Sequence, residues 1–236
     1  MMKLGVLKTG RPPKPAIERF GTYPDMFMNL LGRDAYVWRT YAVDEGELPA
    51  RPEDCDAYII TGSACGVYDQ EPWIGKAMEF LRQAKGRAAL VGVCFGHQLM
   101  AQAFGGRVMK SPKGWGVGEH VYEVLRAEPW MDERPLRIRL PASHQDQVVE
   151  KPPGTEVYLA SEFTPFAGLV WPDEKAISIQ PHPEFEPAYA MSLIEHRRGG
   201  VYPDEQADAA VASYSGNDDR ARVGRWIATF LKHATS

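Results

Sequence analysis

One stretch, residues 88–106, constrains the fold of this chain more than any other. An apolar run ends at Cys94, and a helical pattern starts directly after it, which predicts a strand, a tight turn and a helix. Gly92 and Gly96 flank the cysteine in the spacing Gly-x-Cys-x-Gly. Small residues at these places let a strained turn lift one side chain above a sheet, so the pattern predicts a nucleophile elbow.

The elbow places Cys94 at the N-terminus of a helix. Backbone N–H groups and the helix dipole favour a negative thiolate there, which makes the sulfur a nucleophile near neutral pH. The alternative is a structural cysteine packed in the core, which is what free cysteines most often are. The elbow alone leaves both interpretations open.

The segments before the elbow alternate between strand and helix patterns. Strands are expected at 3–9, 35–43 and 57–60, a proline-rich loop at 10–15, and helices at 24–32 and 70–84. This order predicts an α/β fold with a mostly parallel sheet covered by helices on both faces. Ligands of such sheets bind at the carboxyl ends of the strands, where Ser63 and Cys94 both fall.

After the elbow helix, the sequence pattern changes from alternating strands and helices to a series of short strands. Short strands are expected at 121–125, 136–140, 156–160 and 167–171, which predicts a smaller antiparallel section. A further strand at 176–180 leads into Pro181-His182-Pro183-Glu184-Phe185. Helices are expected at 187–197 and 219–233, with a short one at 205–213 inside the polar segment 199–218. We expect residues 1–236 to form one domain.

Composition narrows the function classes. With 27 basic and 31 acidic residues, the net charge of −4 gives no electrostatic case for nucleic acid. No apolar run is long enough for a signal peptide or a membrane span. Three cysteines form an odd and sparse set, which favours a reducing compartment, and we predict a cytoplasmic protein. Small molecules or proteins are the expected partners.

A cysteine nucleophile needs a base, and the base needs a group that fixes its tautomer. His182 and Glu184 are the candidates, because residues i and i+2 of an extended segment point to the same side. Taken alone, this pair could equally be a surface loop with a histidine and a carboxylate.

The two motifs together carry a family resemblance. Gly-Val-Cys-Phe-Gly-His-Gln at 92–98 and Gln-Pro-His-Pro-Glu-Phe at 180–185 resemble the signatures of the class I glutamine amidotransferases, which hold a Cys-His-Glu triad in this order. The resemblance extends to residues 60–63, 104–106 and 143–148. The chain is similar to stand-alone members related to the glutaminase domain of GMP synthetase, and to γ-glutamyl peptidases. It implies the flavodoxin-like architecture of that family.

The resemblance also implies a reaction. Cys94 attacks the side-chain amide of glutamine, His182 takes the thiol proton and returns it to ammonia, and Glu184 holds His182. Water then hydrolyses a γ-glutamyl thioester to glutamate. No cofactor and no metal are implied. The resemblance implies that the backbone N–H groups of Gly62, Ser63 and Phe95 bind the oxyanion. The residues that it implies for substrate binding are Gln98, Ser143, His144, Gln145 and Asp146.

Some features depart from the family pattern. Thr61-Gly62-Ser63 replaces the usual glycine-glycine-proline loop, and residues 199–218 match nothing in the core family, so they are expected to shape a partner surface or a lid. The sequence contains no Gly-x-x-x-x-Gly-Lys-Ser/Thr phosphate loop. Ammonia therefore needs an accepting partner protein, or the enzyme simply hydrolyses glutamine.

Three alternatives remain. A γ-glutamyl peptidase would use the same triad on γ-glutamyl peptides or conjugates, and a regulatory subunit would keep the pocket without catalysis. A zinc site at Cys94, His97 and His182 lacks the usual ligand spacing. We expect His97 to make a structural hydrogen bond instead, and Trp115 either to line the pocket or to be a buried aromatic.

Overall fold

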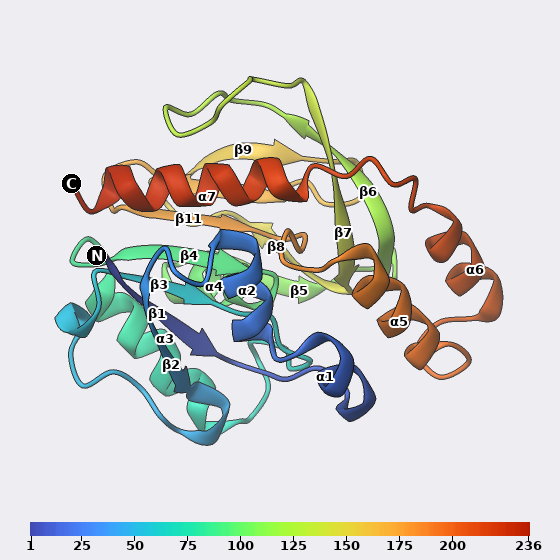
Figure 1. Ribbon diagram of the computed structural model, residues 1–236, viewed down its shortest axis with the longest axis horizontal. Helices are drawn as coiled ribbons and strands as arrows, with labels where there is room; N and C mark the ends of the chain where they lie inside the picture. The colour runs from blue at the N-terminus through green and yellow to red at the C-terminus, as the bar shows by residue number, and fades with distance from the viewer.

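The computed structural model describes residues 1–236 and is built around a nine-stranded sheet with the order β2-β1-β3-β4-β11-β10-β9-β6-β7 (Figure 1). A separate pair, β5 and β8, forms a small antiparallel sheet. The strands are β1 Lys3–Lys8, β2 Val37–Ala42, β3 Ala57–Ile60, β4 Ala89–Val93, β5 Arg107–Lys110, β6 Gly116–Val124, β7 Arg137–His144, β8 Asp146–Glu150, β9 Glu156–Ala160, β10 Gly168–Trp171 and β11 Ala176–Ile179. The helices are α1 Lys14–Phe20, α2 Tyr23–Leu31, α3 Pro72–Ala84, α4 Phe95–Ala103, α5 Pro187–Arg197, α6 Asp204–Ala212 and α7 Arg220–Ala234, with short 3-10 turns at Val43–Glu45 and Pro52–Asp54.

The large sheet has a parallel and an antiparallel half. Strands β2, β1, β3, β4 and β11 pair in parallel. From β11 onward, β10, β9, β6 and β7 continue the same sheet by antiparallel pairing. The predicted fold class is therefore confirmed, and the antiparallel section is an extension of the parallel sheet.

Helices cover both faces of the sheet, as the sequence predicts. Alternate residues of a strand face opposite sides, so Ile59 and Val91 pack with α2 and α7 while Tyr58 and Leu90 pack with α3 and α4. Helices α2 and α7 lie on the near side of the sheet in Figure 1. Such strands, apolar on both faces, are typical of the buried centre of an α/β sheet.

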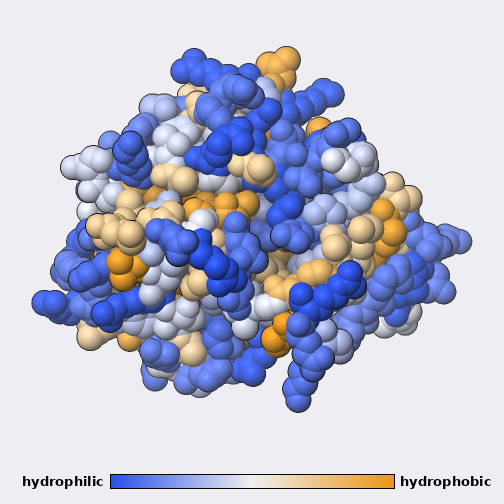
Figure 2. Space-filling view, viewed as in Figure 1, coloured by the Kyte–Doolittle hydropathy of each residue, from blue (hydrophilic) through white to orange (hydrophobic).

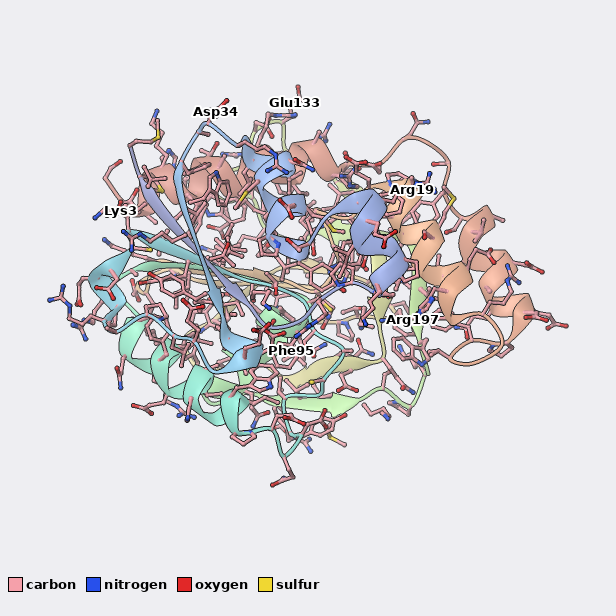
Figure 3. The ribbon with its side chains drawn as sticks, turned by 60° about the horizontal axis from the view of Figure 1, so that its bottom comes forward. Lys3, Arg19, Asp34, Phe95, Glu133 and Arg197 are labelled. Carbon is pink, nitrogen blue, oxygen red and sulfur yellow. The ribbon has the colours of Figure 1, made fainter.

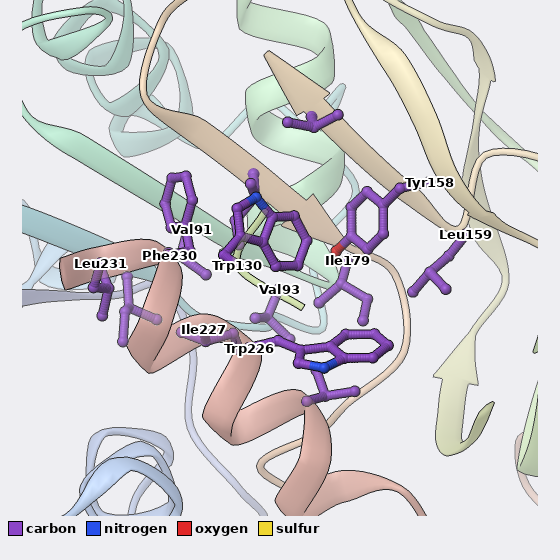
Figure 4. Close-up of a cluster of buried hydrophobic side chains, with 14 of the residues drawn as sticks. Val91, Val93, Trp130, Tyr158, Leu159, Ile179, Trp226, Ile227, Phe230 and Leu231 are labelled. Atoms are coloured by element: carbon purple, nitrogen blue, oxygen red, sulfur yellow. The ribbon is translucent and has the colours of Figure 1, made fainter. Parts of the chain in front are cut away.

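An aromatic cluster fastens α7 to the sheet (Figure 4). The Trp130 ring meets the rings of Tyr158, Trp226 and Phe230 edge to face, with centroids 5.3, 6.3 and 6.1 Å away. The indole N–H of Trp226 donates to the Asp132 carboxylate at 2.6 Å, so this buried polar atom is paired. The segment between β6 and β7 is thereby packed onto α7.

Most helix positions follow the sequence, but α1 begins inside the segment expected to be a proline-rich loop, because proline is tolerated in the first turn of a helix. Helix α5 spans the predicted 187–197, α6 matches the short helix expected at 205–213, and α2 ends at Gly32, whose φ of 98° needs glycine. Strands β6 and β7 are longer than predicted, and the β5–β8 sheet was not foreseen as a separate unit.

The surface of the face shown in Figure 2 is mostly hydrophilic, and its apolar patches are small and scattered. Among the helices, none has both the length and the apolar character needed to cross a membrane.

Candidate active site

The elbow forms as predicted between β4 and α4. Cys94 is the N-cap residue of α4, with φ 52° and ψ −104°, a conformation that L-residues rarely adopt. Its N–H donates to the Ile179 carbonyl at 2.9 Å, and the N–H of Gly96 donates to the Thr61 carbonyl at 3.1 Å. These bonds fix the turn to the ends of the two neighbouring strands.

Packing explains the two flanking glycines. A Cβ on Gly92 would lie 2.6 Å from both the Gly96 carbonyl oxygen and the Met100 sulfur, and one on Gly96 would collide with the Ile60 carbonyl. Both positions therefore exclude any side chain, because the helix must approach the strands this closely.

His182 and Glu184 lie just past the end of β11, the strand beside β4. Nδ1 of His182 is 2.8 Å from Oε1 of Glu184, and both side chains are buried. The backbone N–H of His182 donates to the Pro141 carbonyl at 2.8 Å, which holds the segment outside regular strand pairing. The ring also lies close to Cys94, because a Cβ on Gly62 would be 3.1 Å from Cε1 of His182 and 3.8 Å from Cβ of Cys94. The structure thus brings the three residues together.

The surroundings of His182 raise its pKa. Burial by itself lowers the pKa of His182, but the adjacent Cys94 and Glu184 charges and hydrogen bonds outweigh burial and raise it to about 10. The ring stacks on Phe185 with centroids 3.8 Å apart and planes 8° from parallel. A buried imidazole ring that lies between Cys94 and the Glu184 carboxylate is suited to proton transfer.

Three backbone N–H groups near Cys94 have no partner within the protein. Phe95 is the first residue of α4, where helical N–H groups lack intrahelical acceptors, and neither its N–H nor those of Gly62 and Ser63 donate to another group. Gly62 is close enough that a Cβ there would lie 3.1 Å from Cε1 of His182 and 3.8 Å from Cβ of Cys94. These N–H groups can donate hydrogen bonds to an oxygen atom that develops a negative charge.

The loop that carries Gly62 is anchored from β1. The Thr9 hydroxyl donates to the Thr61 carbonyl at 2.9 Å, and the Thr9 N–H donates to the Thr61 hydroxyl at 3.0 Å. Both threonines are fully buried. This pair fixes the chain immediately before the glycine.

A cleft of about 440 Å³ opens above Cys94. Loop 63–69 forms one wall and residues 143–146 form another. Gln98 lines it from α4, where its side-chain nitrogen donates to the Asp146 carbonyl at 2.8 Å and to Oε1 of Gln180 at 3.1 Å. Gln98 therefore ties the substrate-side wall to the elbow helix.

The predicted substrate loop at 143–146 needs a correction. Ser143 and His144 are the last residues of β7 and Asp146 is the first of β8, so only Gln145 lies between strands. The reason is that β7 and β8 belong to different sheets, and the chain changes sheet here in one residue.

The ring of His144 is buried and points into the protein. Its Nδ1 is 3.0 Å from the Asp146 carbonyl oxygen, and burial lowers its pKa to about 3. His97 behaves similarly, because burial lowers its pKa to about 3 and its Nδ1 lies 2.7 Å from the Ser178 hydroxyl. The structural hydrogen bond expected for His97 is confirmed.

Some cleft residues were not predicted. Arg197, the last residue of α5, donates to the Ser143 hydroxyl at 3.0 Å and to the Tyr202 hydroxyl at 3.1 Å. Its guanidinium lies over the Trp115 ring, 5.7 Å from the centroid, and Trp115 does line the cleft. Tyr68 reaches the Asp146 carboxylate at 2.8 Å. No sequence signal marks Arg197 or Tyr68, because they meet the other cleft residues only through the fold.

No group of three or more His, Cys, Asp or Glu side chains is arranged to hold a metal ion. A larger cleft of about 510 Å³ lies between α1, α2, α7 and the start of α5, and its lining includes Glu184 but not Cys94.

The chain is similar to several known proteins. The family model described as glutamine amidotransferase class-I matches residues 31–196. A glutamine amidotransferase-like protein of Schizosaccharomyces pombe is 28% identical, with 97% of this chain and 98% of that protein covered. Gamma-glutamyl peptidase 4 of Arabidopsis thaliana is 28% identical, with 94% and 92% covered.

A GMP synthase of Thermosipho melanesiensis is 32% identical over 69% of this chain, but only 30% of that protein is covered. Among solved structures, a glutamine amidotransferase from Thermotoga maritima superposes with a TM-score of 0.78 at 18% identity, covering 100% of this chain and 98% of that one. At that identity the likeness concerns the fold.

Proposed function

Because this chain belongs to the class-I glutamine amidotransferase family, we propose that it is a cysteine-dependent hydrolase of γ-glutamyl amides, with glutamine as the simplest substrate. The observation that carries the proposal is the buried Cys94, His182 and Glu184 cluster at the ends of two adjacent strands. The relatives of this chain include hydrolytic enzymes, among them a gamma-glutamyl peptidase and a glutamine-hydrolysing GMP synthase.

In the proposed reaction, the Cys94 thiol gives its proton to His182, and the resulting thiolate attacks the γ-carbonyl carbon of the substrate and forms a C–S bond. His182 gives its proton to the amide nitrogen as the C–N bond breaks, and ammonia or an amine leaves. Glu184 accepts from Nδ1 of His182 and so holds the ring in one orientation. A water molecule, deprotonated by His182, then hydrolyses the γ-glutamyl thioester to glutamate.

The oxyanion formed during each step faces the unpaired N–H groups of Phe95 and of Gly62 or Ser63. A donor of this kind lowers the barrier by roughly 3 kcal/mol in other hydrolases. The short distance from Gly62 to both Cys94 and His182 supports this assignment, although the loop departs from the usual family sequence.

We assign substrate binding to the other wall of the cleft. Gln98, Ser143, Gln145 and Asp146 line it, with His144 as a buried support for the turn. The Asp146 carboxylate can meet the α-ammonium group of a γ-glutamyl substrate, and backbone groups of the turn can meet its α-carboxylate.

The same chemistry can release either of two leaving groups, ammonia or an amine. A glutaminase would release ammonia, which a partner protein could accept, as the glutamine-hydrolysing GMP synthase relative suggests. A γ-glutamyl peptidase would release an amine, and the gamma-glutamyl peptidase relative supports this candidate because it matches over almost its whole length. We also propose that residues 1–236 act as one domain, which the shared nine-stranded sheet supports.

The test is hydrolysis of glutamine and of γ-glutamyl dipeptides by the wild-type chain and by Cys94→Ala. We expect turnover by the wild type, none by the variant, and labelling of Cys94 by a chloroketone analogue of glutamine. Full activity of the variant, or an unlabelled Cys94, would contradict the proposal. A chain inert toward every γ-glutamyl compound, but active after mixing with a partner, would instead indicate a regulated subunit.

A further inference from the structure

A second cleft, of about 420 Å³, adjoins the cleft that contains Cys94. The two clefts share Ala64, Arg197 and Val201 as lining residues. The remaining walls of the second cleft come from the proline-rich segment 11–13 after β1, from Tyr23 of α2 and from the end of α5. Figure 3 labels Arg197 to one side of Phe95, which begins α4.

The second cleft lies on the His182 side of the active site. Tyr23, which lines it, stacks on Phe185 with centroids 5.8 Å apart, and Phe185 stacks on His182 at 3.8 Å. In the proposed reaction His182 delivers its proton to the leaving nitrogen. The leaving group therefore departs toward this cleft, while the glutamyl part stays with Gln98 and Asp146.

The lining of the second cleft is basic. It contains Arg11, His196 and Arg197, and none of its lining residues is acidic. Arg11 is exposed and forms ion pairs with Asp44 at 3.6 Å and Glu45 at 3.3 Å, which offset its charge.

Arg197 is different, because it is partly buried and has no carboxylate within ion-pair distance. Its hydrogen bonds go to two hydroxyl groups, those of Ser143 and Tyr202, and its ring neighbour is Trp115. Neutral partners hold the guanidinium in place but leave its charge uncompensated at the junction of the two clefts. A positioned, unpaired guanidinium is suited to a carboxylate.

We propose that the second cleft is a subsite for the leaving amine, and that Arg197 selects amines that carry a carboxylate, such as amino acids and small peptides. This inference rests on the proposed γ-glutamyl hydrolase function. Ammonia, the leaving group of glutamine, fills none of this subsite. The amide C–N bond breaks as the C–S bond to Cys94 forms, the amine takes the His182 proton, and its carboxylate stays against Arg197 until it diffuses away.

The experiment compares γ-glutamylglycine with γ-glutamylglycinamide, which differ only in the charge of the leaving amine. We expect the wild type to show a higher kcat/KM for γ-glutamylglycine by about tenfold to a hundredfold, the range of one hydrogen bond to a charged group. In Arg197→Gln the ratio of the two kcat/KM values falls close to one. In Arg197→Lys, which keeps the charge without the planar fork, the ratio lies between these limits.

Arg19→Gln is the matched control. It removes the same charge from an exposed arginine that lines neither of the two clefts, and the ratio stays at the wild-type value. Thermal unfolding of each variant shows whether it is folded, and Arg197→Lys keeps the test decisive if Arg197→Gln does not fold.

Equal kcat/KM values for the two substrates in the wild type, or an unchanged ratio in folded Arg197 variants, would overturn the subsite while leaving the proposed function standing. Failure of the proposed function itself looks different. Neither compound nor glutamine would be hydrolysed, and the glutamine chloroketone would leave Cys94 unlabelled.

Discussion

Strain at Cys94 gives a prediction that does not depend on knowing the substrate. The residue has φ 52° and ψ −104°, where a Cβ is strongly disfavoured. Backbone conformations of this kind cost about 1–3 kcal/mol for an L-residue, and glycine escapes that cost. At an ordinary position, glycine is less favourable than alanine by about 0.5–1 kcal/mol.

At Cys94 these two free energies make glycine the more stable replacement, whereas alanine is the more stable one at an ordinary position. Subtracting the glycine penalty from the strain leaves Cys94→Gly more stable than Cys94→Ala by about 1 kcal/mol. In a chain of this size that difference raises Tm by about 2–4 °C. Both variants lack the sulfur, so the comparison isolates the backbone term. The assay is urea unfolding at constant m-value, supported by calorimetric Tm values.

Ala209→Gly is the control, because Ala209 is exposed on α6 and should lose about 1 kcal/mol on substitution. If Cys94→Gly is less stable than Cys94→Ala, by the margin seen at Ala209, the elbow is not strained and the reasoning fails. A lower stability of Cys94→Gly would also remove the main structural argument that the backbone at Cys94 is strained for function.

Three further predictions follow from the site. Because the pKa of His182 is raised from 6.5 to about 10, protonation of His182 stabilises the folded state fully below pH 6.5, and this stabilisation is lost as pH rises toward 10. In Glu184→Gln the loss should begin at lower pH. Free energies of unfolding of this variant that match the wild type across pH 6–10 would refute the prediction. Gly62→Ala places a Cβ 3.1 Å from Cε1 of His182, so kcat should fall by about tenfold or more through displacement of the ring; Gly75→Ala, with open space around it, is the control and should keep kcat. Gln98→Met removes the two hydrogen bonds that the Gln98 amide donates to the Asp146 carbonyl and to Gln180, so the free energy of unfolding should fall by about 1–3 kcal/mol and KM should rise. An unchanged KM in steady-state kinetics would exclude a role of Gln98 in shaping the substrate wall.

The sequence was informative wherever one local pattern determines the structure. The elbow, the flanking strands and the i, i+2 relation of His182 and Glu184 follow from spacing and side-chain periodicity within a few residues, and the fold class follows from the order of those patterns. Helix α5 and the glycine that ends α2 likewise depend on local signals.

Features formed by distant segments were not predictable. The strand β5 is short and mostly exposed, so its pairing with β8 has no apolar signature. Likewise, Arg197 occupies the last turn of a helix, where a basic residue is ordinary, and only the packing of α5 beside residues 115 and 143 gives it a cleft to face. The His144 ring is buried because the chain passes from β7 to β8, which belong to different sheets, at the single residue Gln145. No hydrophobic periodicity in the sequence indicates this change.

The position of β11 has a consequence for the order of folding. This strand is the last of the large sheet along the chain, yet it lies in the middle, between β4 and β10. Before residues 176–179 are in place, β4 and β10 are two open edges and the sheet is two separate halves. The pairing of β11 with β10 is a local hairpin, but its pairing with β4 joins residues 90–93 to 176–179. Contacts of such large sequence separation slow folding and leave the β4 edge unpaired and exposed to aggregation for longer. The same pairing with β4 carries His182 to Cys94, so a chain still emerging from the ribosome holds its cysteine without its base until the sheet is closed.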